Sequence, residues 1–244
     1  MIKRFTFNHY EVNCYVVSDD RVPTEGVERP CAIVDPACEA SFEDSQLLQY
    51  LDELRLTPTV VLLTHAHVDH IAGLRQVCEH FHLPVTMHRD GRKLLRQAEA
   101  YGAIMGFAVD NMEDLDVVEI EDGDVIELVE NGKLKVESGA TQTTPVNPST
   151  SHTPLSTRIE CRYVPGHCPG SMCFVVAADK AVITGDALFH FSIGRTDLPG
   201  GDYATLIDKL KTRVMTLPDD YTVLPGHGIE SQIGKERKYN SFLV

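Results

Sequence analysis

Short apolar runs, many of them alternating with polar residues, recur along the whole chain and predict β-strands. Between them lie stretches with apolar residues three or four positions apart, the spacing of an amphipathic helix. This alternation favours a layered α/β arrangement over a helix bundle or a simple sandwich. The predicted strands cover 2–7, 14–18, 31–35, 59–63, 85–88, 125–129, 133–138, 159–164, 172–177, 181–185 and 221–225. The predicted helices cover 41–55, 73–82, 91–105, 203–215 and, with a weaker pattern, 231–239.

One stretch interrupts this pattern, because residues 138–157 consist mainly of Ser, Thr and Pro. Such a segment buries little apolar surface, so we predict an inserted surface loop. A functional loop, either a lid or a docking segment, is the alternative interpretation. The strand pattern resumes unchanged after it, and we therefore predict a single domain that spans residues 1–244.

The composition is that of an ordinary globular protein, with 43% hydrophobic and 24% charged residues. No window is long and apolar enough to cross a bilayer, and the first residues alternate where a signal peptide needs an unbroken apolar centre. We therefore expect a cytoplasmic protein with no membrane partner. The formal net charge of -14 repels polyanions, so we also expect no nucleic-acid partner. The pattern indicates no oligomeric state.

The cysteines have the usage of reduced, buried residues. There are seven of them, an odd number, and most lie within apolar runs. No CxxC pair offers a zinc-thiolate site. We therefore predict that they have structural roles.

The candidate chemistry is concentrated directly after the strand predicted at 59–63. His65, His67, Asp69 and His70 lie within six residues there. Histidine and carboxylate are natural ligands of zinc, iron and manganese, and α/β proteins place their sites at the carboxyl ends of strands. In an extended loop, His65 and His67 could share one metal while Asp69 and His70 face another. A chance surface cluster is the alternative, which the density of ligand side chains disfavours.

Three further segments offer single candidate ligands, and each follows an apolar strand. They are His167 in PGHCPGS, Asp186 in TGDALF and His227 in LPGHG. The neighbouring glycines let the backbone turn sharply beside each of these residues. Each segment is a weak signal alone, but together with the first cluster they complete seven candidate ligands for a two-metal site.

In this order, THAHVDH, PGHCPGS, TGDALF and LPGHG resemble the signature segments of the metallo-β-lactamase superfamily, over nearly the whole chain. The resemblance implies a four-layered αββα sandwich with the site at one edge of two facing sheets. It implies that one metal is held by His65, His67 and His167. It implies that the other is held by Asp69, His70 and His227, with Asp186 bridging the two.

The loop IGRTDLPGGD and the tail GIESQIGKERKYNSFL are similar to those of short glyoxalase II-like proteins. The resemblance implies a dinuclear-metal hydrolase that cleaves a small-molecule hydroxyacyl thioester. The nucleophile would be a metal-bridging hydroxide, with Asp69 as the catalytic residue that orients the water or moves its proton. Zinc is the expected metal, and iron or manganese are the alternatives. Asp186 and the absence of a signal peptide disfavour a true β-lactamase.

This sequence departs from the glyoxalase II pattern because only residues 228–244 follow His227. Typical members continue there into a helical domain that recognises glutathione, so the resemblance does not extend to the thiol. Cys168 stands where members usually carry Thr, and we expect its thiol to pack to one side.

Three cations are candidate contacts for the substrate: Arg195, Lys235 and Arg237. An ion pair with Asp197 is the alternative for Arg195, and a solvated helix face is the alternative for the other two. For the whole protein, the alternatives are a mononuclear-iron persulfide dioxygenase, a lactonase or phosphodiesterase on the same metal pair, and a scaffold without catalysis.

Overall fold

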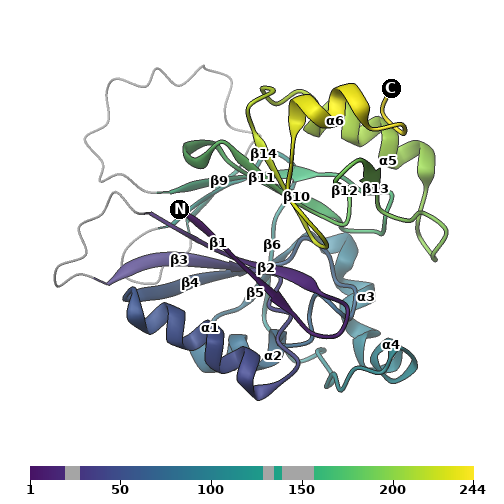
Figure 1. Ribbon diagram of the computed structural model, residues 1–244. Helices are drawn as coiled ribbons and strands as arrows, with labels where there is room; N and C mark the ends of the chain where they lie inside the picture. Colours follow the sequence, from purple (N-terminus) through teal and green to yellow (C-terminus); the bar gives the residue numbers. More distant parts are fainter. Residues whose placement is uncertain (20–27, 129–134, 139–156) are drawn as a thin grey trace.

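The computed structural model describes residues 1–19, 28–128, 135–138 and 157–244. Two β-sheets face each other, and helices cover the outer face of each sheet (Figure 1). α1 and α2 lie against the first sheet, and α5 and α6 lie against the second. The predicted four-layered αββα sandwich is therefore confirmed.

The first sheet has six strands in the order β1-β2-β3-β4-β5-β6. β1, β2 and β3 pair antiparallel, whereas β3 to β6 run parallel. Its inner strands are rich in Val, Ile and Leu because both of their faces are buried. The bounds are β1 Ile2–Phe7, β2 Val12–Ser18, β3 Arg29–Val34, β4 Leu56–Leu62, β5 Val85–Met87 and β6 Val117–Glu119.

The second sheet has seven strands in the order β15-β14-β11-β10-β9-β7-β8. All neighbours pair antiparallel except β11 and β14, which are parallel. The bounds are β7 Val125–Glu127, β8 Lys135–Glu137, β9 Arg158–Tyr163, β10 Met172–Val176, β11 Ala181–Gly185, β14 Thr222–Pro225 and β15 Ser231–Gln232. A small separate hairpin consists of β12 Leu188–Phe189 and β13 Ser192–Ile193.

The helices differ from the predictions in two places. The helix predicted at 91–105 is two helices, because the backbone leaves helical geometry at Gln97 (φ -94°, ψ 2°). The helix predicted at 203–215 continues after α5 as a π-helical turn, Leu210–Val214. The bounds are α1 Ser41–Glu53, α2 Leu74–Phe81, α3 Arg92–Arg96, α4 Ala98–Met105, α5 Tyr203–Lys209 and α6 Ile233–Tyr239.

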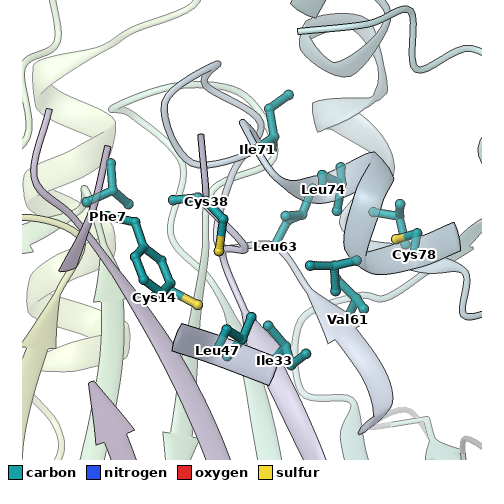
Figure 2. Packing of buried hydrophobic residues seen from close by; sticks show 14 of the residues in the cluster. Phe7, Cys14, Ile33, Cys38, Leu47, Val61, Leu63, Ile71, Leu74 and Cys78 are labelled. Atoms are coloured by element: carbon teal, nitrogen blue, oxygen red, sulfur yellow. The ribbon is translucent and has the colours of Figure 1, made fainter. Parts of the chain in front are cut away.

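Apolar side chains fill all three spaces between the four layers. Alternation along β2 shows how one strand serves two of them, because successive side chains point to opposite faces. Cys14 and Val16 pack toward α1 and α2, whereas Tyr15 and Val17 pack toward the second sheet. Figure 2 shows Leu47 of α1 packed into the apolar cluster between the first sheet and its helices. Full burial of such a side chain contributes about 1.5–3 kcal/mol.

All seven cysteines are free and buried, as predicted. In the described part of the chain, no helix is long and apolar enough to span a membrane. The polar loop predicted at 138–157 lies, apart from its two end residues, outside the described residues. The single domain stays a prediction.

Candidate metal centre

The loops that follow four strands meet at one edge of the sandwich, and they carry all seven candidate ligands. The segment from His65 to His70 follows β4, and His167 lies in the loop between β9 and β10. Asp186 follows β11 directly, and His227 comes shortly after β14. Because β11 and β14 run parallel, their carboxyl ends are adjacent. The site therefore spans both sheets.

The first group of ligands consists of three histidines. The ligand atoms of His65, His67 and His167 all lie within 4.8 Å of one another, and Nε2 of His167 is 2.9 Å from Nδ1 of His67. His65 is 1% exposed, and its Nε2 is buried without a hydrogen-bond partner among the described residues. An unpaired buried nitrogen is costly unless something binds it.

The second group consists of Asp69, His70 and His227, whose ligand atoms also lie within 4.8 Å of one another. Nε2 of His227 is 3.2 Å from Oδ2 of Asp69 and 3.3 Å from Nε2 of His70. A carboxylate oxygen and two imidazole nitrogens therefore converge on one point.

Asp186 lies between the two groups. Its Oδ2 is 3.7 Å from Nε2 of His167 and 3.6 Å from Nε2 of His227, and its Oδ1 is 3.2 Å from Nε2 of His70. This is the position that a bridging ligand needs. Together with the unpaired Nε2 of His65, the donor set fits two metal ions, and the clusters are consistent with a dinuclear metal site.

The first group is held in the form that binds metals, because a ligating imidazole must be neutral. Burial and the neighbouring imidazoles lower the pKa of His65 well below its ordinary value. Burial and the nearby His167 lower the pKa of His67 to about 4. Burial likewise lowers the pKa of His167. These three rings are therefore neutral at pH 7.

The second group contains the compensating negative charge. Burial opposes ionisation of Asp69 and Asp186, but His70 and His227 together outweigh it for Asp69, as these two and His167 do for Asp186, and both carboxyl pKa values are lowered. In return, burial works against a charged His70, but Asp186 and Asp69 raise its pKa well above the ordinary value. Two carboxylates thus attract a cation, which is a proton on His70 or a metal ion in its place.

Second hydrogen bonds orient three of the imidazoles so that Nε2 faces the centre. Nδ1 of His70 donates to Oδ2 of Asp35 at 2.9 Å. Nδ1 of His167 donates to the carbonyl oxygen of Arg195 at 2.8 Å, and Nδ1 of His227 donates to that of Tyr10 at 2.9 Å. Such bonds fix the tautomer and the ring orientation of metal ligands.

Asp35 contacts one of the candidate ligands and supports a second through Thr64, and the sequence did not predict it. It is 1% exposed and accepts hydrogen bonds from the Thr64 amide at 2.7 Å, the Thr64 hydroxyl at 2.6 Å and His70. Because that hydroxyl donates to Asp35, it accepts from Nδ1 of His65 at 3.0 Å. The available signal was an aspartate at the carboxyl end of the strand predicted at 31–35. The observed strand, β3, ends at Val34 and pairs parallel with β4, so Asp35 lies close to His65.

The predicted role of glycine beside the ligands has a clear basis at Gly226. A Cβ atom there would collide with Oδ1 of Asp186 and lie 2.7 Å from Cε1 of His70. Only glycine lets the backbone of the loop after β14 come this close to the centre.

A cavity of about 380 Å³ opens on the metal centre. Arg195 lines it, and its guanidinium makes two hydrogen bonds of 2.8 Å to the carboxylate of Asp197. This is the ion pair that was the alternative to contact with the substrate. Lys235 and Arg237 on α6 are not among the described residues that line the cavity. Arg237 donates to Asp219 and to two backbone carbonyls instead. Their contact with substrate stays a prediction.

The thiol of Cys168 was expected to pack to one side, but it lies close to the first group of ligands. Its Sγ lies within 4.8 Å of the ligand atoms of His65, His67 and His167. It is also 3.3 Å from the hydroxyl of Ser171, and burial raises the pKa of the thiol to about 12. The resemblance implies no metal-binding role for this position, and the contact with Ser171 gives the thiol a structural one.

The chain matches a known protein family over most of its length. Residues 9–227 match the model of the metallo-beta-lactamase superfamily, and the chain belongs to that family. It is 31% identical over 241 residues to hydroxyacylglutathione hydrolase GloC of Haemophilus influenzae, covering 96% of this chain and 93% of that protein. Family membership and the histidine and aspartate clusters together identify this protein as a metal-dependent hydrolase.

Two solved structures are similar over nearly their whole length. One is the BLEG-1 B3 metallo-beta-lactamase, with a TM-score of 0.76 and 27% identity over 100% of both chains. The other is TTHA1623 in a di-iron-bound form, with a TM-score of 0.75 and 28% identity over 99% of this chain and 100% of that one.

Proposed function

We propose that this protein is a thioesterase that hydrolyses a small-molecule hydroxyacyl thioester at a dinuclear metal centre. The observation that carries the proposal is the pair of three-residue ligand groups joined by Asp186, with a cavity opening on both. The relationship to a hydroxyacylglutathione hydrolase supports the same substrate class. The net charge of -14 agrees with a small-molecule substrate and disfavours nucleic acid.

Two bound divalent cations would supply an activated water and polarise the thioester carbonyl. Asp69 lines the cavity and keeps an ionised carboxylate, because its pKa is low beside His70. That carboxylate would accept a proton from water in the cavity. No general acid is needed, because a thiol has a pKa of roughly 8.5 and leaves as the thiolate.

Zinc is the metal that we propose, since histidine and carboxylate ligands suit it well. Iron is the first alternative, which the di-iron form of the similar TTHA1623 supports. Manganese accepts the same ligand types.

The main competing function is a persulfide dioxygenase, which needs one iron held by two histidines and an aspartate. That site would leave His70 and His227 without a metal, whereas both converge with Asp69 on one point. A lactonase or phosphodiesterase would use the same metal pair. A β-lactamase activity has one argument in its favour, the similarity to BLEG-1.

The test combines metal content with two activity assays on the purified protein. We expect about two metals per chain and hydrolysis of S-lactoylglutathione, without oxygen uptake when glutathione persulfide is supplied. Asp69→Asn should reduce hydrolysis by about 100-fold or more, while Asp114→Asn, a control at an exposed carboxylate, should have no effect. One iron per chain with persulfide-dependent oxygen uptake would refute the proposal.

A further inference from the structure

The side of the cavity that faces the metal ligands is apolar. Its volume of about 380 Å³ lies within the range of about 300–1,000 Å³ that is typical of small-molecule sites. α3 and α4 supply most of this wall, and the loop after Arg195 closes it. The apolar wall residues that matter here are Leu94, Ala98, Tyr101, Ile104, Met105 and Leu198.

Large apolar side chains gather at the mouth of this cavity without being covered. Ile104 is 80% exposed, Tyr10 is 42% exposed and Tyr101 is 36% exposed. A single exposed isoleucine needs no explanation. Three exposed residues of this kind around one opening do need an explanation, because a group of exposed apolar side chains marks a ligand site.

Charge is scarce in the same wall. Among the described lining residues, the only Lys or Arg is Arg195, and its guanidinium is held by Asp197. The other ionisable lining groups, apart from two tyrosines, are the candidate metal ligands themselves. A charged substrate group pressed against α4 would therefore lose water without gaining a partner, which is costly.

We propose that α4 binds an apolar chain on the acyl group, so that the hydroxyacyl group of the substrate carries an alkyl or aryl chain larger than the methyl group of lactate. This inference rests on the proposed function and narrows its acyl group. The carrier thiols of cells are hydrophilic, so the apolar wall suits the acyl side of the scissile bond. Ile104 and Tyr101 would then be specificity-determining residues.

The chemistry is ordinary hydrolysis. The oxygen of one water bonds to the carbonyl carbon, and the C–S bond breaks with its electron pair going to sulfur. The products are the carboxylate, the thiol and one proton. The apolar chain takes no part in these steps, but its burial on α4 is retained in the transition state and so raises kcat/KM.

The test is an acyl series on one small neutral thiol, N-acetylcysteamine, with the metal-loaded protein. Acetyl, butanoyl, hexanoyl, benzoyl and lactoyl thioesters would be compared by release of free thiol. We expect kcat/KM to rise about fourfold for each CH₂ added between acetyl and hexanoyl, and lactoyl to rank below butanoyl. A flat series, or a preference for lactoyl, would overturn the inference while leaving the thioesterase in place.

A matched pair of variants on α4 locates the effect. Ile104→Ser should lower the hexanoyl-to-acetyl ratio of kcat/KM about tenfold. Ala103→Ser changes a neighbouring exposed residue outside the cavity wall and should leave that ratio unchanged. Equal hexanoyl-to-acetyl ratios of kcat/KM in the two variants would show that α4 does not bind the acyl chain.

A binding measurement covers the case in which no thioester is hydrolysed, which would refute the proposed function. Calorimetric titration with hexanoate and with acetate compares two ligands that share a carboxylate and differ only in the chain. Tighter binding of hexanoate that Ile104→Ser abolishes would still support an apolar ligand on α4. Equal binding of the two acids would overturn it.

Discussion

Replacing Asp35 by Asn should weaken the metal centre without touching a ligand. Asp35 uses both carboxylate oxygens, one for the Thr64 amide and the other for the Thr64 hydroxyl and His70. An asparagine side chain has one oxygen and one NH₂ group. In the variant, the NH₂ group would therefore face at least one of the donors that Asp35 now accepts from. The loss of one charge-assisted hydrogen bond costs about 1.5–3 kcal/mol.

That cost should appear in metal affinity, because Asp35 orients His70 directly and His65 through Thr64. Loss of such a supporting carboxylate typically lowers metal affinity by about 10–100-fold. We therefore expect Asp35→Asn to lower the affinity for both metals. Thr64→Val should chiefly lower the affinity for the metal beside His65.

The assay is competitive metal titration against a chromophoric chelator, with urea unfolding of the metal-free protein alongside it. Asp124→Asn is the control, because Asp124 is also a buried carboxylate that accepts a backbone amide, at 2.8 Å from Glu121. Wild-type affinity for both metals in Asp35→Asn, or an equal loss in Asp124→Asn, would refute this account of Asp35.

Three further predictions concern the rest of the chain. All seven cysteines are buried, and burial raises the pKa of Cys78, Cys168 and Cys173 to about 12, so Ellman's reagent should titrate no thiol in the folded protein and all seven in urea. Arg237→Ala removes bonds to Asp219 and two carbonyls; we expect about 1–2 kcal/mol less stability in urea unfolding and an unchanged KM, whereas a raised KM would support contact with substrate. Removal of the metals by a chelator should lower the thermal midpoint, because ligand at 100 times its Kd contributes about 2.7 kcal/mol to stability.

The fold was predictable because most of its strands are long enough to carry a pattern. Within the described residues, every predicted strand overlaps an observed one. The missed strands, β6, β12, β13 and β15, have only two or three residues each. Because β5, β7 and β8 are nearly as short and were predicted, a strand of this length carries a pattern too weak to be predicted consistently. The break in the helix predicted at 91–105 was missed because Gln97 is a good helix former, so its residue type gives no sign of a helix end.

The candidate ligands were predictable because each is a side chain of the right chemistry directly after an apolar strand. Asp35 satisfies the same condition, but it has no neighbouring histidine to draw attention to it. The carbonyls that orient His167 and His227 leave no trace in the sequence, since every residue has one. The apolar cavity wall likewise depends on how α4 lies against the loop after Arg195, which is a matter of tertiary packing.

The two carbonyls have a consequence for how this protein could change over evolutionary time. His227 and His167 are held by the main chain of Tyr10 and Arg195, while the side chains of the same two residues line the cavity. Mutation at positions 10 and 195 can therefore alter what the cavity accepts and keep the bonds that orient the imidazoles. A library randomised at these two codons would sample new specificities on an inherited catalytic centre.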